Sequence, residues 1–253
     1  MEDLRRREEE EDVGFKNKME NINKTDDKYI FKAKIEDSLA NAIRRYVGQI
    51  QIAAIDEVEI VKNDSPLYDE TLAHRLGLIP LKQGSKKEGK LRLNSQEKGV
   101  VYSGALKGDF DVVYDKIPIT LLSDGQEIEL VATVKMGIGQ NHAKFSPGIM
   151  NYRENSEIYT DKEIAEKIKN AHPNIEVKQK GDKYVIVDDK EKEITDLCEG
   201  LAEKHNKKIE VKTNGEIIIS LESFGQLDAK NIFIKSIDAL EKDLNEITKK
   251  LGK

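Results

Sequence analysis

The sequence predicts a mixed α+β fold with more than one domain. Residues 37–47 and the stretch beyond residue 227 carry apolar side chains at helical spacing. The middle of the chain instead holds short runs of Val, Ile and Leu broken by glycine, which is typical of β-structure with loops. These runs are 100–105, 117–122 and 128–134. A Lys/Glu-rich region after Tyr152 adds a third kind of segment in which helices and strands alternate.

Composition limits the classes of function that the chain can have. It has 253 residues, of which 38% are hydrophobic and 36% charged. No apolar run approaches the roughly 20 residues that cross a bilayer, and no signal-peptide core is present at the start, so we expect a cytoplasmic protein. The net charge of -6 argues against a surface that binds DNA phosphates directly, because such surfaces are usually basic.

The first third of the chain contains several expected elements. A charged tail over residues 1–12 precedes a β-hairpin over 15–35. Asp37 or Ser38 can cap a helix. A long strand is then expected over 50–61 and a short helix over 67–76. The first of these helices is expected to bury Leu39, Ala42, Ile43, Tyr46 and Val47.

The region after Tyr152 predicts a small ferredoxin-like domain. Helical patterns at 161–171 and 193–205 alternate with strand patterns. Strands are expected near 175–177 and 184–187, and two more, near 209–211 and 216–221, return the chain to the main body. A single cysteine, Cys198, cannot supply the several thiolates that a cubane iron–sulfur cluster needs. We therefore expect no cofactor and no metal.

The terminal helix carries the strongest periodic signal. One apolar seam recurs in alternating steps of four and three through Phe233, Ile237, Leu240, Leu244, Ile247 and Leu251. Two interpretations fit this seam equally well. The helix can lie on the protein's own core, or it can pair with a helix of a partner.

No catalytic motif accompanies these elements. The sequence contains no phosphate-binding loop, nucleophile elbow or zinc-protease helix, and Gly137-Ile138-Gly139 lacks the third glycine of a dinucleotide site. The four histidines are far apart in the chain and lack the spacing of metal ligands. We expect a protein that is not an enzyme by itself.

Three segments resemble one family. The helix Asn41-Ala42-Ile43-Arg44-Arg45 is followed by Ala54-Ile55-Asp56-Glu57-Val58-Glu59-Ile60, and then by Asp69-Glu70 and His74-Arg75-Leu76-Gly77-Leu78-Ile79-Pro80-Leu81. This order resembles the RNA polymerase family that includes bacterial alpha subunits, eukaryotic third-largest-type subunits and their archaeal D-type counterparts. The segments His142-Ala143-Lys144-Phe145-Ser146-Pro147 and Glu222-Ser223-Phe224-Gly225 resemble two further motifs of that family.

The resemblance implies an alpha-subunit-like dimerisation domain at 13–48 and 223–253. A β-rich insert domain at 49–153 and 213–222, and a ferredoxin-like insert at 154–212, would complete the chain. It further implies a non-catalytic assembly subunit that pairs with the small subunit L through the terminal seam. Arg44 and Arg45 would contact the large catalytic subunits, and Asp69, Glu70, His74 and Arg75 are weaker candidates for that role.

The branch of the family is expected to be archaeal. The chain stops after its long helix, where a bacterial alpha subunit continues into a DNA-binding domain, and it lacks the zinc-binding cysteines of many eukaryotic relatives. Two alternatives stay open: the equivalent subunit of a eukaryotic polymerase, and a stand-alone ferredoxin-like binding protein.

Overall fold

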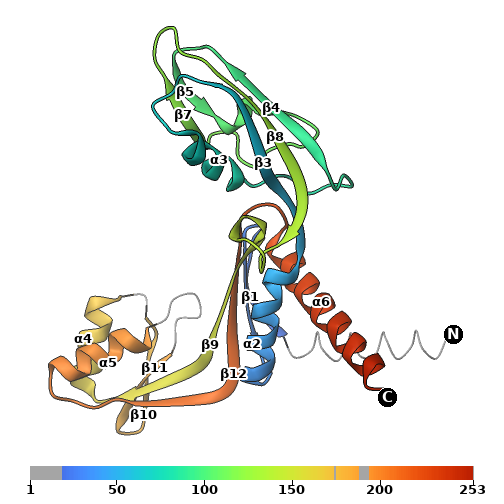
Figure 1. The fold of residues 1–253 in the computed structure, drawn as a ribbon. Helices are drawn as coiled ribbons and strands as arrows, with labels where there is room; N and C mark the ends of the chain where they lie inside the picture. The colour runs from blue at the N-terminus through green and yellow to red at the C-terminus, as the bar shows by residue number, and fades with distance from the viewer. Residues whose placement is uncertain (1–18, 174, 188–193, 253) are drawn as a thin grey trace. The chain divides into compact units, whose positions relative to one another are not determined.

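The computed structural model describes residues 19–173, 175–187 and 194–252, so the expected tail over 1–12 lies outside it. The described chain divides into two compact units (Figure 1). One contains Tyr29–Asn41 and Asn151–Ser220 with the first strand, and the other contains Ala42–Met150 and Leu221–Lys253 with Thr25–Lys28. The mixture of helices with antiparallel sheets confirms the α+β class.

The first unit is built on a six-stranded sheet with the order β1-β2-β12-β9-β11-β10. Strands β1 (Met19–Lys24) and β2 (Lys28–Ala33) form the expected hairpin, with an irregularity between Asn21 and Asn23. Strands β9 (Gly148–Thr160), β10 (Val177–Lys180), β11 (Lys183–Val187) and β12 (Glu210–Ser223) complete the sheet.

The ferredoxin-like segment follows the expected order of elements. Helix α4 (Lys162–Ala171) lies between β9 and β10, and helix α5 (Thr195–Lys204) lies between β11 and β12. The Asp161 carboxylate caps α4 by accepting a hydrogen bond of 2.9 Å from the Ile164 amide. Both helices contribute to one core, where Cys198 is fully buried with Ile158, Ile164, Ile168, Ile175, Ile186, Ile194 and Ala202.

One strand replaces the two that the sequence predicts before the terminal helix. The expected break between 209–211 and 216–221 is absent, because β12 continues through Asn214 and Gly215. Gly215 has φ +74°, and the Asn214 side chain accepts a hydrogen bond of 3.0 Å from the Glu216 amide. The turn-forming residues therefore distort the strand locally without ending it.

The second unit contains a four-stranded sheet with the order β3-β8-β4-β6 and a two-stranded sheet of β5 and β7. Its strands are β3 (Gln51–Asn63), β4 (Gly89–Ser95), β5 (Gly99–Tyr102), β6 (Lys107–Gly108), β7 (Pro118–Leu122) and β8 (Ile128–Ile138). Helix α3 (Asp69–Gly77) contributes Leu72 and Leu76 to the core of this unit. Short 3-10 turns occur at η1 (Val47–Gln49), η2 (Ser103–Ala105) and η3 (Ala143–Phe145).

Helix α2 (Asp37–Tyr46) forms where the sequence predicts a helix, but its buried face is different. Leu39 is 41% exposed, whereas Ala40 is fully buried together with Ile43 and Val47. The three buried residues follow helical spacing of three and four. The prediction placed Leu39 on the buried face, whereas the helix buries the smaller Ala40.

The terminal helix α6 spans Ala229–Lys250. Its first turn is capped by Asp228, whose carboxylate accepts a hydrogen bond of 2.9 Å from the Asn231 amide. The helix packs against η1, and the Tyr46 hydroxyl donates a hydrogen bond of 2.9 Å to Asp243. This bond raises the pKa of Tyr46 above its ordinary value.

Candidate functional site

Asp56 stands out on strand β3 because the strand bulges at that position. The ladder between β3 and β8 pairs Ile55 with Val134 and Glu57 with Thr133, which leaves Asp56 as the extra residue. A bulge leaves its extra residue outside the ladder and turns it toward other partners. The backbone carbonyl and the carboxylate of Asp56 both accept hydrogen bonds from one lysine, Lys144.

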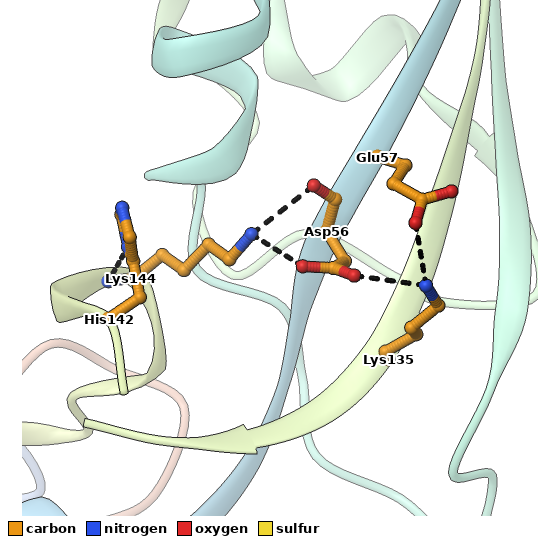
Figure 2. Close-up of polar contacts among 5 residues, drawn as sticks. All are labelled: Asp56, Glu57, Lys135, His142 and Lys144. Carbon is orange, nitrogen blue, oxygen red and sulfur yellow. Dashed lines mark hydrogen bonds and ion pairs between the residues drawn. The ribbon is translucent and has the colours of Figure 1, made fainter. Parts of the chain in front are cut away.

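Lys144 reaches Asp56 from the turn η3 (Figure 2). Its Nζ lies 2.7 Å from the Asp56 carboxylate and 3.2 Å from the Asp56 carbonyl oxygen. The side chain is only 14% exposed. His142 begins the turn, and its Nδ1 accepts a hydrogen bond of 3.1 Å from the Lys144 amide. The turn is therefore held at its start by His142 and across to β3 by Lys144.

A second lysine extends this cluster along β8. The Lys135 Nζ lies 3.1 Å from the Asp56 carboxylate and 2.8 Å from that of Glu57 (Figure 2). The hydrogen bond from Lys144, followed by the one from Lys135, lowers the pKa of Asp56 below its ordinary value. The bond to Glu57 is the main cause of a raised pKa at Lys135. Asp56 and Lys135 are therefore both charged at neutral pH.

A pocket of about 200 Å³ opens beside this cluster. Strand β3, the end of helix α3 and turn η3 each form part of its wall. The lining residues are Ile55, Asp56, Val58, Ala73, His74, Gly77, Leu78, His142 and Lys144. The pocket thus joins three segments that resemble motifs of one polymerase family: 54–60, 74–81 and 142–147.

The same turn also contacts other motifs of the second unit. The Gln140 amide donates a hydrogen bond of 3.0 Å to the Gly48 carbonyl, in η1. The Phe224 amide donates one of 3.0 Å to the Pro147 carbonyl. Gly137 allows this packing, since a Cβ there would lie 2.6 Å from the Phe145 ring. Residues 140–147 therefore form a junction that touches η1, strand β3 and the segment before α6.

The predicted seam on α6 changes character along the helix. Phe233 is buried, and Ile237 and Leu240 are partly buried. The later residues Leu244, Ile247 and Leu251 are 54%, 53% and 72% exposed. The first half of the seam therefore packs within the protein, and the second half presents apolar side chains to solvent.

Arg44 and Arg45 lie exposed in the last turn of α2. Their positive charges interact favourably with the helix dipole there. Among the weaker candidates, Arg75 has a local role, because it donates a hydrogen bond of 2.6 Å to the Pro118 carbonyl. Asp69 accepts one of 2.8 Å from Asn63, and His74 lines the pocket.

Sequence reasoning did not single out the charged cluster. Asp56 and Lys144 stand in segments that resemble family motifs, and Lys135 stands outside them. The resemblance was the only signal in the sequence that could have pointed to the first two. Nothing in the local pattern of β8 marks the third.

The part of the chain that the structure describes contains neither a metal-binding cluster nor a membrane-spanning helix. Across residues 19–173, 175–187 and 194–252, no cluster of three or more His, Cys, Asp or Glu is arranged to hold a metal ion. None of the helices described is both long and apolar enough to span a bilayer.

The comparisons with known proteins all match RNA polymerase subunits or one of their domains. The family model of the RNA polymerase Rpb3/RpoA insert domain matches residues 34–151. The DNA-directed RNA polymerase subunit Rpo3 of Pyrococcus horikoshii is 37% identical over 163 residues, which cover 58% of this chain and 63% of that protein. The Rpo3 subunit of Methanocaldococcus jannaschii is 38% identical over 133 residues, covering 51% of this chain and 70% of that protein.

A longer alignment covers most of the chain. Rpo3 of Methanosphaera stadtmanae is 29% identical over 256 residues and covers 88% of this chain and 94% of the relative. The matches to the Pyrococcus proteins are shorter and span 63% and 59% of those relatives. The matched residues 34–151 include Asp56, Lys135, Lys144 and the whole pocket. The chain therefore belongs to the Rpo3 family of DNA-directed RNA polymerase subunits, whose matching members are archaeal.

Proposed function

We propose that the chain is a non-catalytic assembly subunit of a multisubunit, DNA-dependent RNA polymerase in the cytoplasm of an archaeon. In this role it pairs with the small subunit L, and the pair forms the platform for the large catalytic subunits. The observation that carries the pairing is the exposed apolar half of α6, formed by Leu244, Ile247 and Leu251.

Burial of these side chains supplies a driving force for pairing. Fully burying a Leu or Ile side chain contributes about 1.5–3 kcal/mol, although these three are already partly covered. Their spacing of three and four places them on one stripe of the helix, as in pairs of packed helices. The dimerisation domain would comprise 13–48 and 223–253, with the β-rich insert at 49–153 and 213–222 and the ferredoxin-like insert at 154–212.

Two further assignments complete the proposal. Arg44 and Arg45 contact the large subunits, because exposed guanidinium groups bind carboxylates and carbonyl groups at wet interfaces. The ferredoxin-like insert carries no iron–sulfur cluster, since a cubane needs about four thiolates and Cys198 is the single cysteine. Iron analysis of anaerobically prepared protein tests this point, and stoichiometric iron would contradict it.

The pairing is tested by co-expression of the chain with subunit L. Leu244→Asp places a carboxylate on the proposed contact, and we expect the heterodimer to be lost in size-exclusion chromatography because an unpaired charge is costly to bury. Lys242→Ala is the matched control on the same helix, where the side chain is exposed, and it should change association by less than about 1 kcal/mol. A stable one-to-one complex with Leu244→Asp would show that α6 does not form the contact.

A further inference from the structure

We propose that Asn214 is a modification site, where the side-chain amide is lost by deamidation through Gly215 and the product loosens the contact between β9 and β12. The modification is independent of the role that the chain has in a polymerase. Four observations support it: the Asn-Gly sequence, the open surroundings of Gly215, the hydrogen bond that holds the Asn214 side-chain carbonyl, and the contacts that the modification removes.

Asn214 is followed by glycine, and it is the only asparagine of the chain with that neighbour. In deamidation, the backbone nitrogen of the following residue attacks the side-chain carbonyl carbon of asparagine. A side chain on the attacking residue crowds this approach, and glycine has none. Among the asparagines of the chain, Asn214 is therefore the one whose following residue hinders the reaction least.

The structure leaves the attacking nitrogen accessible. Asn214 and Gly215 are both exposed, although they lie within strand β12 (Figure 1). Gly215 has φ +74°, and a Cβ added there would meet no atom of the described residues within 4 Å, apart from its chain neighbours. Because nothing packs on this side of Gly215, the backbone has room to close the five-membered ring of the cyclic intermediate.

A hydrogen bond holds the carbonyl group that is attacked. The Glu216 amide donates it to the Asn214 Oδ1 at 3.0 Å. The contact joins residues two apart, so it folds the Asn214 side chain back over the backbone of Gly215. The same donor stabilises the negative charge that develops on this oxygen when the nitrogen attacks, as the donors of an oxyanion hole do. The hydrogen bond therefore favours the reaction both by position and by charge.

The reaction balances without an oxidant or a cofactor. The Gly215 nitrogen forms a bond to the Asn214 Cγ, the bond from Cγ to Nδ2 breaks, and the proton of the Gly215 nitrogen leaves with the amino group as ammonia. Water then attacks one of the two carbonyl carbons that flank the ring nitrogen, and the nitrogen regains a proton as that bond breaks. Opening at the side-chain carbonyl gives aspartate, and opening at the main-chain carbonyl gives isoaspartate.

The amide that is lost has a partner in the fold. The Asn214 Nδ2 donates a hydrogen bond of 2.9 Å to the Glu216 carboxylate, which accepts another of 2.8 Å from Asn155 on β9. The Lys32 Nζ on β2 lies 3.7 Å from the same carboxylate. The hydrogen bond from Asn155 is the main cause that holds the pKa of Glu216 below its ordinary value, so Glu216 is charged at neutral pH. Glu216 thus ties β12 to both of its neighbours in the sheet.

Deamidation replaces a hydrogen-bond donor beside Glu216 by a negative charge. A carboxylate at position 214 has no hydrogen to donate and repels the Glu216 carboxylate. Isoaspartate also inserts an additional carbon atom into the main chain of β12, because the chain then runs through the side chain. Either product weakens the contacts that Glu216 makes with β9 and β2. The strand is therefore loosened beside β9, next to the ferredoxin-like insert.

Deamidation is measured in the folded full chain. The protein is incubated at mildly alkaline pH until a synthetic peptide of residues 210–220 is half converted, and aspartate and isoaspartate are then located by peptide mass spectrometry. We expect both products at Asn214. Asn94 is the internal control, because it is also exposed on a strand but is followed by Ser95, and it should stay unmodified. An unmodified Asn214 in the folded chain overturns the proposal, and so does equal conversion at Asn94.

Two variants test the chemistry. Gly215→Ala adds a methyl group to the attacking residue, and we expect it to slow conversion by about tenfold because the approach to Cγ is crowded. Asn214→Gln moves the amide one methylene group further from the Gly215 nitrogen, so conversion at this position should become undetectable. A conversion rate that is unchanged in either variant overturns the assignment of Gly215 as the attacking residue.

Asn214→Asp reproduces the aspartate product directly. We expect the amides of β9 and β12 near Asn155 and Glu216 to exchange hydrogen about fivefold faster in the full chain, because a hydrogen bond is lost and a like charge is added. Asn94→Asp is the matched control, since it places the same charge on an exposed strand of the other compact unit. Unchanged exchange in Asn214→Asp, or an equal increase in Asn94→Asp, overturns the proposed loosening.

Discussion

Lys144 and Asp56 stand 88 positions apart in the sequence and are joined by an ion pair of 2.7 Å. The pair connects turn η3 to the bulge of β3 and is mostly shielded from solvent, with 14% and 28% of the two side chains exposed. Replacing Lys144 leaves the partly buried oxygens of Asp56 without this hydrogen-bond donor. We therefore expect Lys144→Met to lower the free energy of unfolding by about 1–3 kcal/mol. Urea titration measures this loss.

The control for that measurement is Lys62→Met. Lys62 lies 2.5 Å from Glu127, but its side chain is 48% exposed. Exposed ion pairs contribute little to stability because solvent screens them, so this variant should differ little from the unaltered chain. Equal losses of unfolding free energy in the two variants would contradict the structural role that we assign to Lys144.

The low pKa of Asp56 predicts how the stability of the protein depends on pH. Hydrogen bonds from Lys144 and Lys135 lower this pKa in the folded state. The carboxylate therefore stabilises the fold above its unfolded pKa of about 3.9, and this contribution is lost as the pH falls through the folded pKa. We expect the advantage of the unaltered chain over Asp56→Asn to be constant from neutral pH to about pH 5 and to shrink in more acidic solution. Urea titrations at several pH values measure it, and an advantage that grows on acidification would contradict the assignment.

Gly225 occupies a backbone conformation that suits glycine. Its φ is +98°, and an added Cβ would lie 2.7 Å from the Tyr114 hydroxyl oxygen and 2.8 Å from the Val113 Cγ1. We expect Gly225→Ala to lower the free energy of unfolding by about 1–2 kcal/mol, because side chains disfavour this conformation. Thermal unfolding monitored by circular dichroism measures the loss. Gly84→Ala serves as the control, because an added Cβ at Gly84 meets no atom within 4 Å. An unchanged melting temperature in Gly225→Ala would contradict the described packing.

The two halves of the α6 seam should respond differently to truncation in the isolated chain. Phe233 is 4% exposed, so Phe233→Ala should cost about 3–5 kcal/mol of stability. Leu244→Ala removes a half-exposed side chain and should change stability by less than about 0.5 kcal/mol. Denaturant unfolding of the chain without any partner distinguishes them. A large loss with Leu244→Ala would mean that the second half also packs within the protein.

Cys198 provides a probe of the ferredoxin-like insert. Its side chain is fully buried against Ile186 and Ala202, among others. A buried thiol in apolar surroundings reacts slowly, so a thiol reagent should modify Cys198 only when the insert opens. We expect the reaction to be slow in buffer and complete within mixing time in denaturant. Rapid modification of the folded chain would contradict the burial.

Periodicity predicted those elements whose faces differ in polarity. The terminal helix follows from apolar residues such as Ile237 and Leu240, and the order of the insert follows from alternating patterns between Tyr152 and Leu221. Periodicity failed where partners distant in the chain decide the outcome. Pairing within the sheet keeps β12 continuous through Asn214, and tertiary packing buries Ala40 in place of Leu39.

The site itself was visible in the sequence only as separate motifs. Asp56 and Lys144 each stand in a segment that resembles the family, but no local pattern shows that they meet. Their contact depends on the bulge between Ile55 and Glu57. Asp56 is the extra residue of this bulge, so it is not paired in the ladder with β8. Bulges depend on cross-strand register and have no sequence signature in this strand.

The ferredoxin-like insert lies between two neighbouring strands, so it can be exchanged as one unit. The segment between Thr160, at the end of β9, and Glu210, at the start of β12, adds β10 and β11 at one edge of the sheet, and β9 and β12 are themselves neighbours in the sheet. Asn155 and Glu216 join them by a hydrogen bond of 2.8 Å. Because the exit and entry points are adjacent, a short hairpin turn can close the gap. Gene rearrangement can therefore enlarge, shrink or exchange everything between these points while β9 and β12 keep their pairing.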